Sequence, residues 1–205
     1  MPDLQATYDR IAKAWLQNNA EDKWWVVGAS IFASLFRRGN TLLDMGCGAG
    51  IKTQFFAERD LNVTGIDFSL GMLETARLKA PTCKFEQFDL YKIEEYPQTF
   101  DGIWLQAVLL HVPKNQAKAV LEKLITRLNP GGYLYVGVKE IPPGTKDEEQ
   151  KVEKVYGEEH SRFFAYYTML ELQTLLESIG LTLVWQDYTP GKNIRWLEVI
   201  YQKAG

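Results

Sequence analysis

The chain has 205 residues, of which 46% are hydrophobic and 24% charged, and its formal net charge is −3. A chain of this size buries enough surface to form a core, and two cysteines with two histidines are too few for most zinc modules. The acidic balance disfavours a nucleic-acid binder, although a local basic patch would be enough for one. No apolar run approaches the roughly 18 to 20 residues of a membrane span, so we expect a cytoplasmic protein with no membrane partner.

Apolar runs alternate with helical patterns between residues 41 and 139, which is typical of a series of βαβ units in one α/β domain. The N-terminal segment, residues 1–39, is predicted to form one or two helices. The expected strands are residues 41–45, 61–67, 83–88, 100–105 and 133–139. The expected helices between them are residues 52–59, 71–79 and 115–128.

The C-terminal third begins with a strongly charged segment. Between Asp147 and Glu159 there are six acidic and two basic residues, a composition that predicts a solvated helix or a mobile segment. An amphipathic helix is expected over residues 168–179. Residues 181–187 and 194–202 alternate as two strands around a Pro-Gly turn, which predicts an antiparallel hairpin.

A glycine-rich turn follows the first expected strand. Gly46, Gly48 and Gly50 precede a helix whose first N–H groups are free to bind a polar or anionic ligand. Glycine also allows the backbone to approach such a ligand closely. Asp67 ends the second strand roughly 20 residues further along, where a carboxylate can accept both hydroxyls of a ribose. The pattern predicts a nucleoside-binding site.

The turn departs from the dinucleotide-binding fingerprint, in which the last position is Gly or Ala. Ile51 stands at that position. Asp44, just before the turn, would face a pyrophosphate unfavourably but would suit an ammonium group or a bound water. An NAD(P)-dependent oxidoreductase is therefore the most distant alternative.

Five segments, in order, resemble the motifs of class I S-adenosylmethionine-dependent methyltransferases. They are LLDMGCGAG (42–50), GIDFSLGML (65–73), FDL (88–90), FDGIWLQAVLLHV (100–112) and LNPGGYLYV (128–136). The resemblance implies an α/β, Rossmann-like, doubly wound seven-stranded sheet with helices on both faces. The implied strand order is 3-2-1-4-5-7-6, with strand 7 antiparallel.

The resemblance also implies one methyltransferase domain over residues 1–205, with four parts. These are an N-terminal helical cap (1–40), a cofactor-binding core (41–140), a lid-like insert (141–165), and a closing helix and β-hairpin (166–205). The implied cofactor is S-adenosyl-L-methionine, and the implied product is S-adenosyl-L-homocysteine.

The family motifs assign site residues to matching positions. Those that would contact the methionine portion of the cofactor are Asp44, Gly46, Cys47, Gly48 and Gln106. Those that would contact the ribose and the adenine are Asp67, Phe68, Met72, Asp89 and Leu90. Tyr8 resembles the N-terminal aromatic residue that closes over the cofactor in many members with small-molecule substrates.

Methyl transfer is a direct displacement, so the protein mainly positions the acceptor, and a base is needed only when the nucleophile must lose a proton. No catalytic residue can be assigned for this reason, and His111 and His160 are the candidates for a base or a substrate contact. Arg162 is a further candidate for substrate contact. Lys139 and Glu140, at the end of the fifth strand, are expected to take part in an ion pair, and no metal site is expected.

The expected function is methyl transfer to a small molecule by a monomer or a homodimer. One alternative is a tRNA or protein methyltransferase, which a basic face around Arg37, Arg38 and Lys52 would favour and the acidic total disfavours. The other alternative is a non-catalytic module that binds S-adenosylmethionine without transferring its methyl group.

Overall fold

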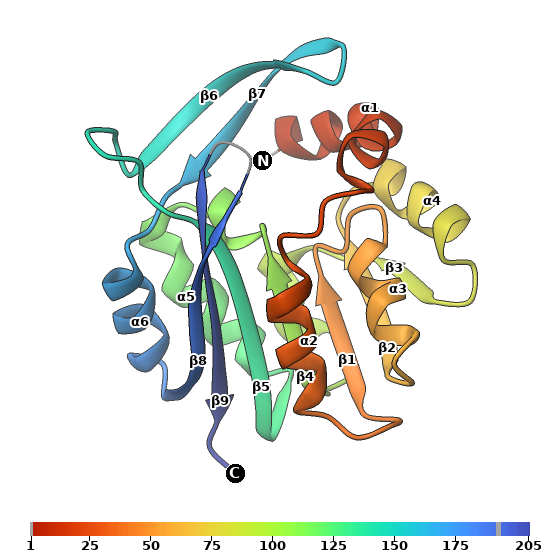
Figure 1. Ribbon diagram of the computed structural model, residues 1–205, viewed down its shortest axis with the longest axis vertical. Coiled ribbons are helices and arrows are strands. Elements are labelled where there is room, and N and C mark those ends of the chain that lie inside the picture. Colours follow the sequence, from red (N-terminus) through yellow and green to blue (C-terminus); the bar gives the residue numbers. More distant parts are fainter. Residues whose placement is uncertain (1, 192–193) are drawn as a thin grey trace.

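A seven-stranded sheet forms the centre of the molecule, with strand order β3-β2-β1-β4-β5-β9-β8 (Figure 1). The computed structural model describes residues 2–191 and 194–205. The strands are β1 (Thr41–Met45), β2 (Asn62–Asp67), β3 (Lys84–Gln87), β4 (Phe100–Gln106), β5 (Leu128–Lys139), β8 (Leu181–Pro190) and β9 (Arg195–Lys203). The first five are parallel, and β9 runs antiparallel between β5 and β8. The predicted fold class and strand order are confirmed.

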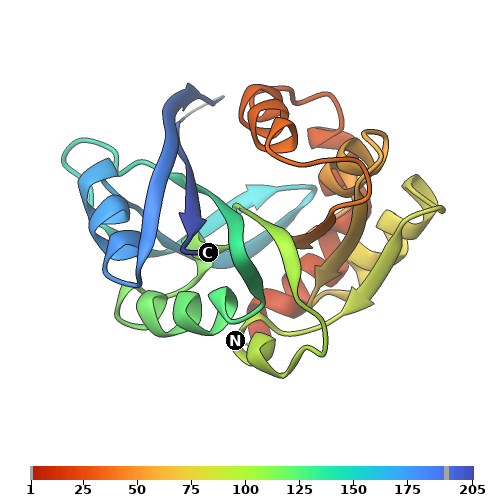
Figure 2. The ribbon, with the colours of Figure 1, turned by 90° about the horizontal axis from the view of Figure 1, so that it is seen from below.

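Helices cover both faces of this sheet (Figure 2). They are α1 (Pro2–Asn19), α2 (Val26–Ser34), α3 (Ile51–Ala57), α4 (Leu70–Lys79), α5 (Lys114–Ile125) and α6 (Met169–Glu177), with short 3-10 helices at Leu90–Glu95 and Leu109–His111. Alternate residues of β4 point to opposite faces. Trp104 packs in the cluster that contains α2 and α3, whereas Ile103 and Leu105 pack in the cluster that contains α5 and α6. The core therefore lies on both sides of the sheet.

The junction between α5 and β5 differs from the prediction, because the helix ends earlier and the strand begins earlier than the sequence indicated. The Asn-Pro-Gly-Gly segment lies within β5 and shifts its register with β4. Phe100 pairs with Leu128 before the shift, and Gly102 pairs with Tyr133 after it. Asn129 Nδ2 donates a hydrogen bond of 2.9 Å to Asp101 Oδ1 across it. A turn-forming sequence can thus lie within a strand when the neighbouring strand holds it.

The charged segment is a β-hairpin, so the prediction of a solvated helix over residues 147–159 is wrong. Strand β6 (Glu148–Val155) pairs antiparallel with β7 (Glu158–Ala165). Tyr156 and Gly157 join them with φ values of 61° and 83°, as a type I′ turn requires. Directly paired residues of an antiparallel hairpin lie on one face, so Glu149, Lys151 and Glu153 share a face with three buried residues of β7, Phe164, Arg162 and His160.

The hairpin crosses above the edge of the sheet where the parallel strands end, and α1 lies beside it (Figure 1). Cys47 and Cys83 are free thiols. In the described ranges, no helix combines the length and apolarity that a membrane span needs. Nor do three His, Cys, Asp or Glu side chains there form a group that could hold a metal ion.

Candidate active site

A cavity of about 1000 Å³ lies at the C-terminal ends of the parallel strands, beneath α1 and the β6–β7 hairpin. Ligands of open α/β sheets bind outside the carboxyl ends of the strands, and known ligand pockets range from roughly 300 to 1000 Å³. The cavity has both the location and the size of a site for a nucleoside cofactor with a second small molecule.

The glycine-rich turn forms one wall of the cavity. The N–H groups of Gly46 and Cys47 both donate to the Ile66 carbonyl, at 2.7 and 2.9 Å, so the turn is fixed against the end of β2. Gly46 has φ of +73°, and a Cβ there would lie 2.2 Å from Cγ2 of Val108. Only glycine therefore fits at this position.

Asp67 is held by backbone groups on both sides. Its Oδ2 accepts from the Gly48 N–H and its Oδ1 from the Ser69 N–H, each at 2.9 Å. The side chain lines the cavity, and burial raises its pKa to about 6. A carboxylate has about four acceptor positions, so each oxygen keeps one for a ligand hydroxyl. The backbone thus orients an acceptor pair toward the cavity.

Asp44 is the second buried carboxyl group of the site. Thr53 Oγ1 donates to its Oδ2 at 2.6 Å, and burial raises the pKa of Asp44 to about 6. Lys52 also lines the cavity, with Nζ 5.0 Å from the ring centre of Trp25, and burial lowers its pKa to about 8. A ligand that carries both an ammonium and a carboxylate group matches this set of charges.

Gln106, at the end of β4, is 7% exposed, and neither its Oε1 nor its Nε2 has a hydrogen-bond partner among the described residues. An unsatisfied buried polar group costs about 1–3 kcal/mol. The amide lines the cavity, so a polar ligand there would satisfy it. Asp89 lies exposed at the rim, and its Oδ1 accepts from the Tyr91 N–H at 2.9 Å.

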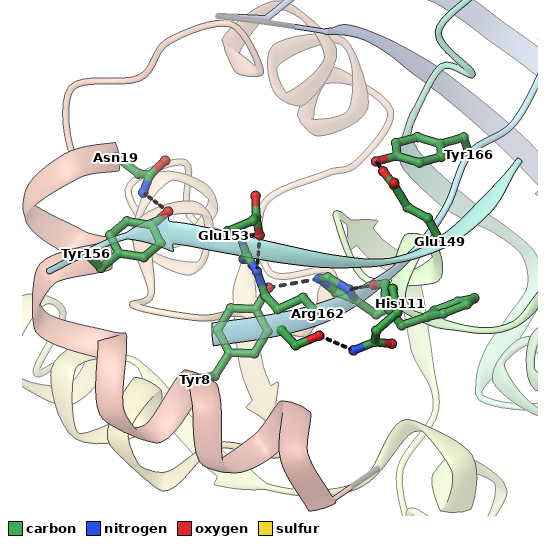
Figure 3. Close-up of polar contacts among 11 residues, drawn as sticks. Tyr8, Asn19, His111, Glu149, Glu153, Tyr156, Arg162 and Tyr166 are labelled. Atoms are coloured by element: carbon green, nitrogen blue, oxygen red, sulfur yellow. Dashed lines mark hydrogen bonds and ion pairs between the residues drawn. The ribbon is translucent and has the colours of Figure 1, made fainter. Parts of the chain in front are cut away.

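A chain of hydrogen bonds joins α1 to the β6–β7 hairpin over the cavity (Figure 3). His111 Nδ1 lies 2.8 Å from the Phe163 carbonyl, which can only accept, so Nδ1 carries the proton. Burial lowers the pKa of His111 to about 3, so the ring is neutral and its Nε2 accepts from the Tyr8 hydroxyl at 2.8 Å. Arg162 Nη1 in turn donates to the Tyr8 hydroxyl at 3.2 Å. Both ring nitrogens of His111 are therefore occupied.

Arg162 is also ion-paired within the hairpin (Figure 3). Its Nε and Nη2 donate to Glu153 Oε2 at 2.8 and 2.5 Å, and the two side chains are only 9% and 15% exposed. Separating a buried pair leaves one charge uncompensated, whereas an apolar pair of similar volume is often tolerated. This ion pair therefore fixes the side chain that holds Tyr8.

Glu153→Met is expected to lower the free energy of unfolding by about 3 kcal/mol, because the Arg162 guanidinium would remain buried without its carboxylate. The double variant Glu153→Met/Arg162→Met is expected to stay within about 1 kcal/mol of the parent chain. Urea unfolding of the parent chain, Glu153→Met, Arg162→Met and the double variant measures these four free energies of unfolding as a double-mutant cycle. A double variant as unstable as Glu153→Met alone would contradict it.

The positions assigned to the cofactor by the sequence all line the cavity. They are Tyr8, Asp44, Gly46, Cys47, Gly48, Asp67, Phe68, Met72, Asp89, Leu90 and Gln106. His111 and Arg162 also line it, at the end covered by the hairpin. His160 is buried in the hairpin and stacks on Tyr156, with ring centroids 6.0 Å apart, and is not part of the lining.

Sequence reasoning missed Glu153 and Trp196, which line the cavity from β6 and β9. Nothing local marked either residue, because residues 148–155 have no apolar–polar alternation. Glu140 does form an ion pair, but with Arg195 on β9 at 2.5 Å. Lys139 lies instead over the ring of Phe164.

Comparisons with known proteins agree with this geometry. A family model described as a methyltransferase domain matches residues 42–132. The ubiquinone biosynthesis O-methyltransferase of Aeromonas salmonicida is 28% identical over 179 residues, which cover 71% of this chain and 73% of that protein. Its namesake from Photorhabdus laumondii is 32% identical over 102 residues, or 47% of this chain, and the match spans less than half (42%) of that relative.

Among solved structures, the 1,6-didemethyltoxoflavin-N1-methyltransferase of Burkholderia thailandensis, with its substrate and S-adenosylhomocysteine bound, is similar at a TM-score of 0.77. It is 18% identical, and the match covers 100% of this chain and 88% of that one. The strand order and the glycine-rich turn with its strand-end carboxylate define a nucleoside-binding α/β protein. Residues 42–132 thus match the methyltransferase-domain family, and the fold is shared with solved methyltransferase structures.

Proposed function

We propose that this chain binds S-adenosylmethionine and an acceptor together in the cavity and transfers a methyl group to the acceptor, a small molecule. The observation that carries the proposal is the convergence of Asp44, Asp67 and Gln106, from three adjacent strands, on one cavity of about 1000 Å³. Tyr8 and the hairpin cover that cavity, which favours a small acceptor over a macromolecule.

The residues present fit the cofactor. Asp67 offers an acceptor position on each oxygen for the ribose hydroxyls, and the amide of Gln106 lacks any other partner in the described chain. A Cβ at Gly48 would meet only Trp15, at 3.9 Å, so the backbone there faces open space that a ligand can fill. Asp44 and Lys52 complement the ammonium and carboxylate ends of an amino acid.

S-adenosylmethionine supplies a methyl group on a positively charged sulfur, so the side chains of this protein need only hold and orient the acceptor. We assign His111 to positioning: it holds the Tyr8 hydroxyl through Nε2 and is itself held by the Phe163 carbonyl. Tyr8 and Arg162 then exclude water from the cavity and keep the hairpin closed over the acceptor.

The class of acceptor is supported by two relatives. The protein from Aeromonas salmonicida is a methyltransferase of ubiquinone biosynthesis, and the protein from Burkholderia thailandensis methylates 1,6-didemethyltoxoflavin. Ubiquinone and 1,6-didemethyltoxoflavin are both small molecules. We propose a small organic acceptor for this chain as well.

Thermal unfolding with a ligand in excess tests the cofactor. S-adenosylmethionine or S-adenosylhomocysteine at 100 times its dissociation constant would add about 2.7 kcal/mol of stability. For a chain of this size, that raises the midpoint by about 5–11 °C. NADH is the control and is expected to give no shift, whereas a shift with NADH alone would overturn the proposal. Transfer of a labelled methyl group to small acceptors then separates an enzyme from a module that only binds the cofactor.

A further inference from the structure

The two ends of the cavity differ in chemistry. The carboxyl groups lie at one side of the sheet: Asp44 is near the end of β1, Asp67 ends β2, and Asp89 follows β3. On the other side of β4, Lys139 ends β5 and pairs in register with Trp196 of β9. Neighbouring strands are about 4.8 Å apart, so β5 lies roughly 10 Å from β1. This basic and aromatic end is where an acceptor would lie beside the cofactor.

The ammonium group of Lys139 lies near two aromatic rings. Its Nζ lies 4.1 Å from the ring centre of Phe164 and 5.9 Å from that of Trp196. No ion pair or hydrogen bond to this Nζ is found among residues 2–191 and 194–205, and the adjacent Glu140 is bound to Arg195. Contacts with ring faces stabilise a cation without neutralising it.

The charges that face Lys139 do not balance it. Arg162, Glu153, Lys151 and Glu149 of the hairpin act on it, and His111 is neutral. Arg162 and Glu153 are paired with each other. Burial lowers the pKa of Lys139 to about 8, so the group is still mainly protonated at pH 7.

Flat aromatic side chains line the Lys139 end of the cavity. Trp24 stacks on Trp196 with ring centroids 4.3 Å apart and an angle of 17° between the planes, and both line the cavity. Phe164 lines it from the hairpin. Ring faces of this kind pack well against another planar ring.

We propose that Lys139 is the specificity-determining residue of this site, and that the acceptor is a planar aromatic molecule whose anionic oxygen, a carboxylate or a phenolate, pairs with its ammonium group. This inference rests on the proposed function and deepens it. The anionic oxygen supplies the counter-charge that the Lys139 ammonium group lacks, and the aromatic ring lies against Phe164 and Trp196.

Calorimetric titration of the full chain saturated with S-adenosylhomocysteine tests this. The aromatic anions are 2-naphthoate and 2,4-dinitrophenolate, and the controls are neutral 2-naphthamide and acetate, which lacks a ring. At least one aromatic anion is expected to bind about tenfold more tightly than the amide, the scale of one charge-assisted hydrogen bond. Acetate is expected to bind more weakly than that anion, and the tighter of the two anions identifies the kind of oxygen.

Lys139→Met keeps most of the length of the side chain and removes its charge, and it is expected to abolish the preference for the anion over the amide. Lys118→Met is the matched control, because it removes the same charge from an exposed position of α5 that does not line the cavity and is not among the groups that act on Lys139. Its preference for the anion is expected to remain. Equal binding of anion and amide by the parent chain, or a preference that survives in Lys139→Met, would overturn the inference.

The thermal shift with S-adenosylhomocysteine separates this inference from the proposed function. Lys139→Met is expected to keep the shift, because the residue lies outside the cofactor end of the cavity. A parent chain that shows no shift refutes the proposed function, whereas a normal shift without any preference for the anion refutes only the role of Lys139.

Discussion

Replacing Gly46 by alanine is expected to lower the free energy of unfolding by about 2–5 kcal/mol. The φ of +73° costs an L-residue about 1–2 kcal/mol. The added Cβ would lie 2.2 Å from Val108 Cγ2, and overpacking of this kind costs about 1–3 kcal/mol more. Urea unfolding measures the change, which corresponds to a fall in melting temperature of about 4–20 °C.

Gly131→Ala is the matched control for this prediction. Gly131 has the same φ of +73°, but nothing lies within 4 Å of an added Cβ. It therefore isolates the backbone cost of about 1–2 kcal/mol. The double variant Gly46→Ala/Val108→Ala removes the side chain that overlaps and is expected to recover part of the loss. If Gly46→Ala and Gly131→Ala were equally unstable, Val108 would not be the reason that position 46 requires glycine.

The parallel part of the fold could be predicted because its signals are local. Each strand is a short apolar run that ends in a turn, and the functional side chains stand where those runs end, as Asp44 and Asp67 do. Strand ends of a parallel sheet meet at one edge. The motifs therefore placed these residues in one cavity without knowledge of any contact between them.

The cover of the cavity could not be predicted because it depends on contacts between distant parts of the chain. Tyr8 meets His111, which lies 103 positions away, and Arg162, which lies 154 positions away. The hairpin was missed because the number of charges in residues 147–159 suggests solvation, whereas Glu153 is paired with Arg162 across the hairpin and is largely buried. The sequence did not indicate the turn of the hairpin either, because Tyr156 occupies a left-handed position that Asn or Asp usually fills.

Replacing Asp67 by asparagine is expected to weaken S-adenosylhomocysteine binding about 10- to 150-fold. Hydrogen bonds to a charged group contribute about 1.5–3 kcal/mol, and the carboxylate would accept those of the ribose hydroxyls. Asparagine keeps the shape of the side chain, but whichever way its amide turns, the NH₂ group faces the N–H of Gly48 or of Ser69. Calorimetric titration at pH 7 measures the loss. Asp60→Asn is the control, because Asp60 is exposed, tolerates asparagine at its φ of 61° and lies outside the cavity.

The pH dependence of binding gives the same prediction a second test. Burial raises the pKa of Asp67 to about 6, and the ligand hydroxyls favour the ionised carboxylate. The affinity is therefore expected to fall as the pH drops below 6. It is also expected to fall as the pH rises past 8, because Lys52, whose pKa is lowered to about 8, then loses the charge that pairs with the ligand carboxylate. Burial also raises the pKa of Asp44 to about 6, so both carboxyl groups can bind protons when the ligand leaves the parent chain. Asp67→Asn keeps only Asp44, and it is therefore expected to take up fewer protons on losing its ligand. Equal affinity and an equal pH profile in the two proteins would remove Asp67 from the site and leave Asp44 as the carboxylate that the ligand contacts.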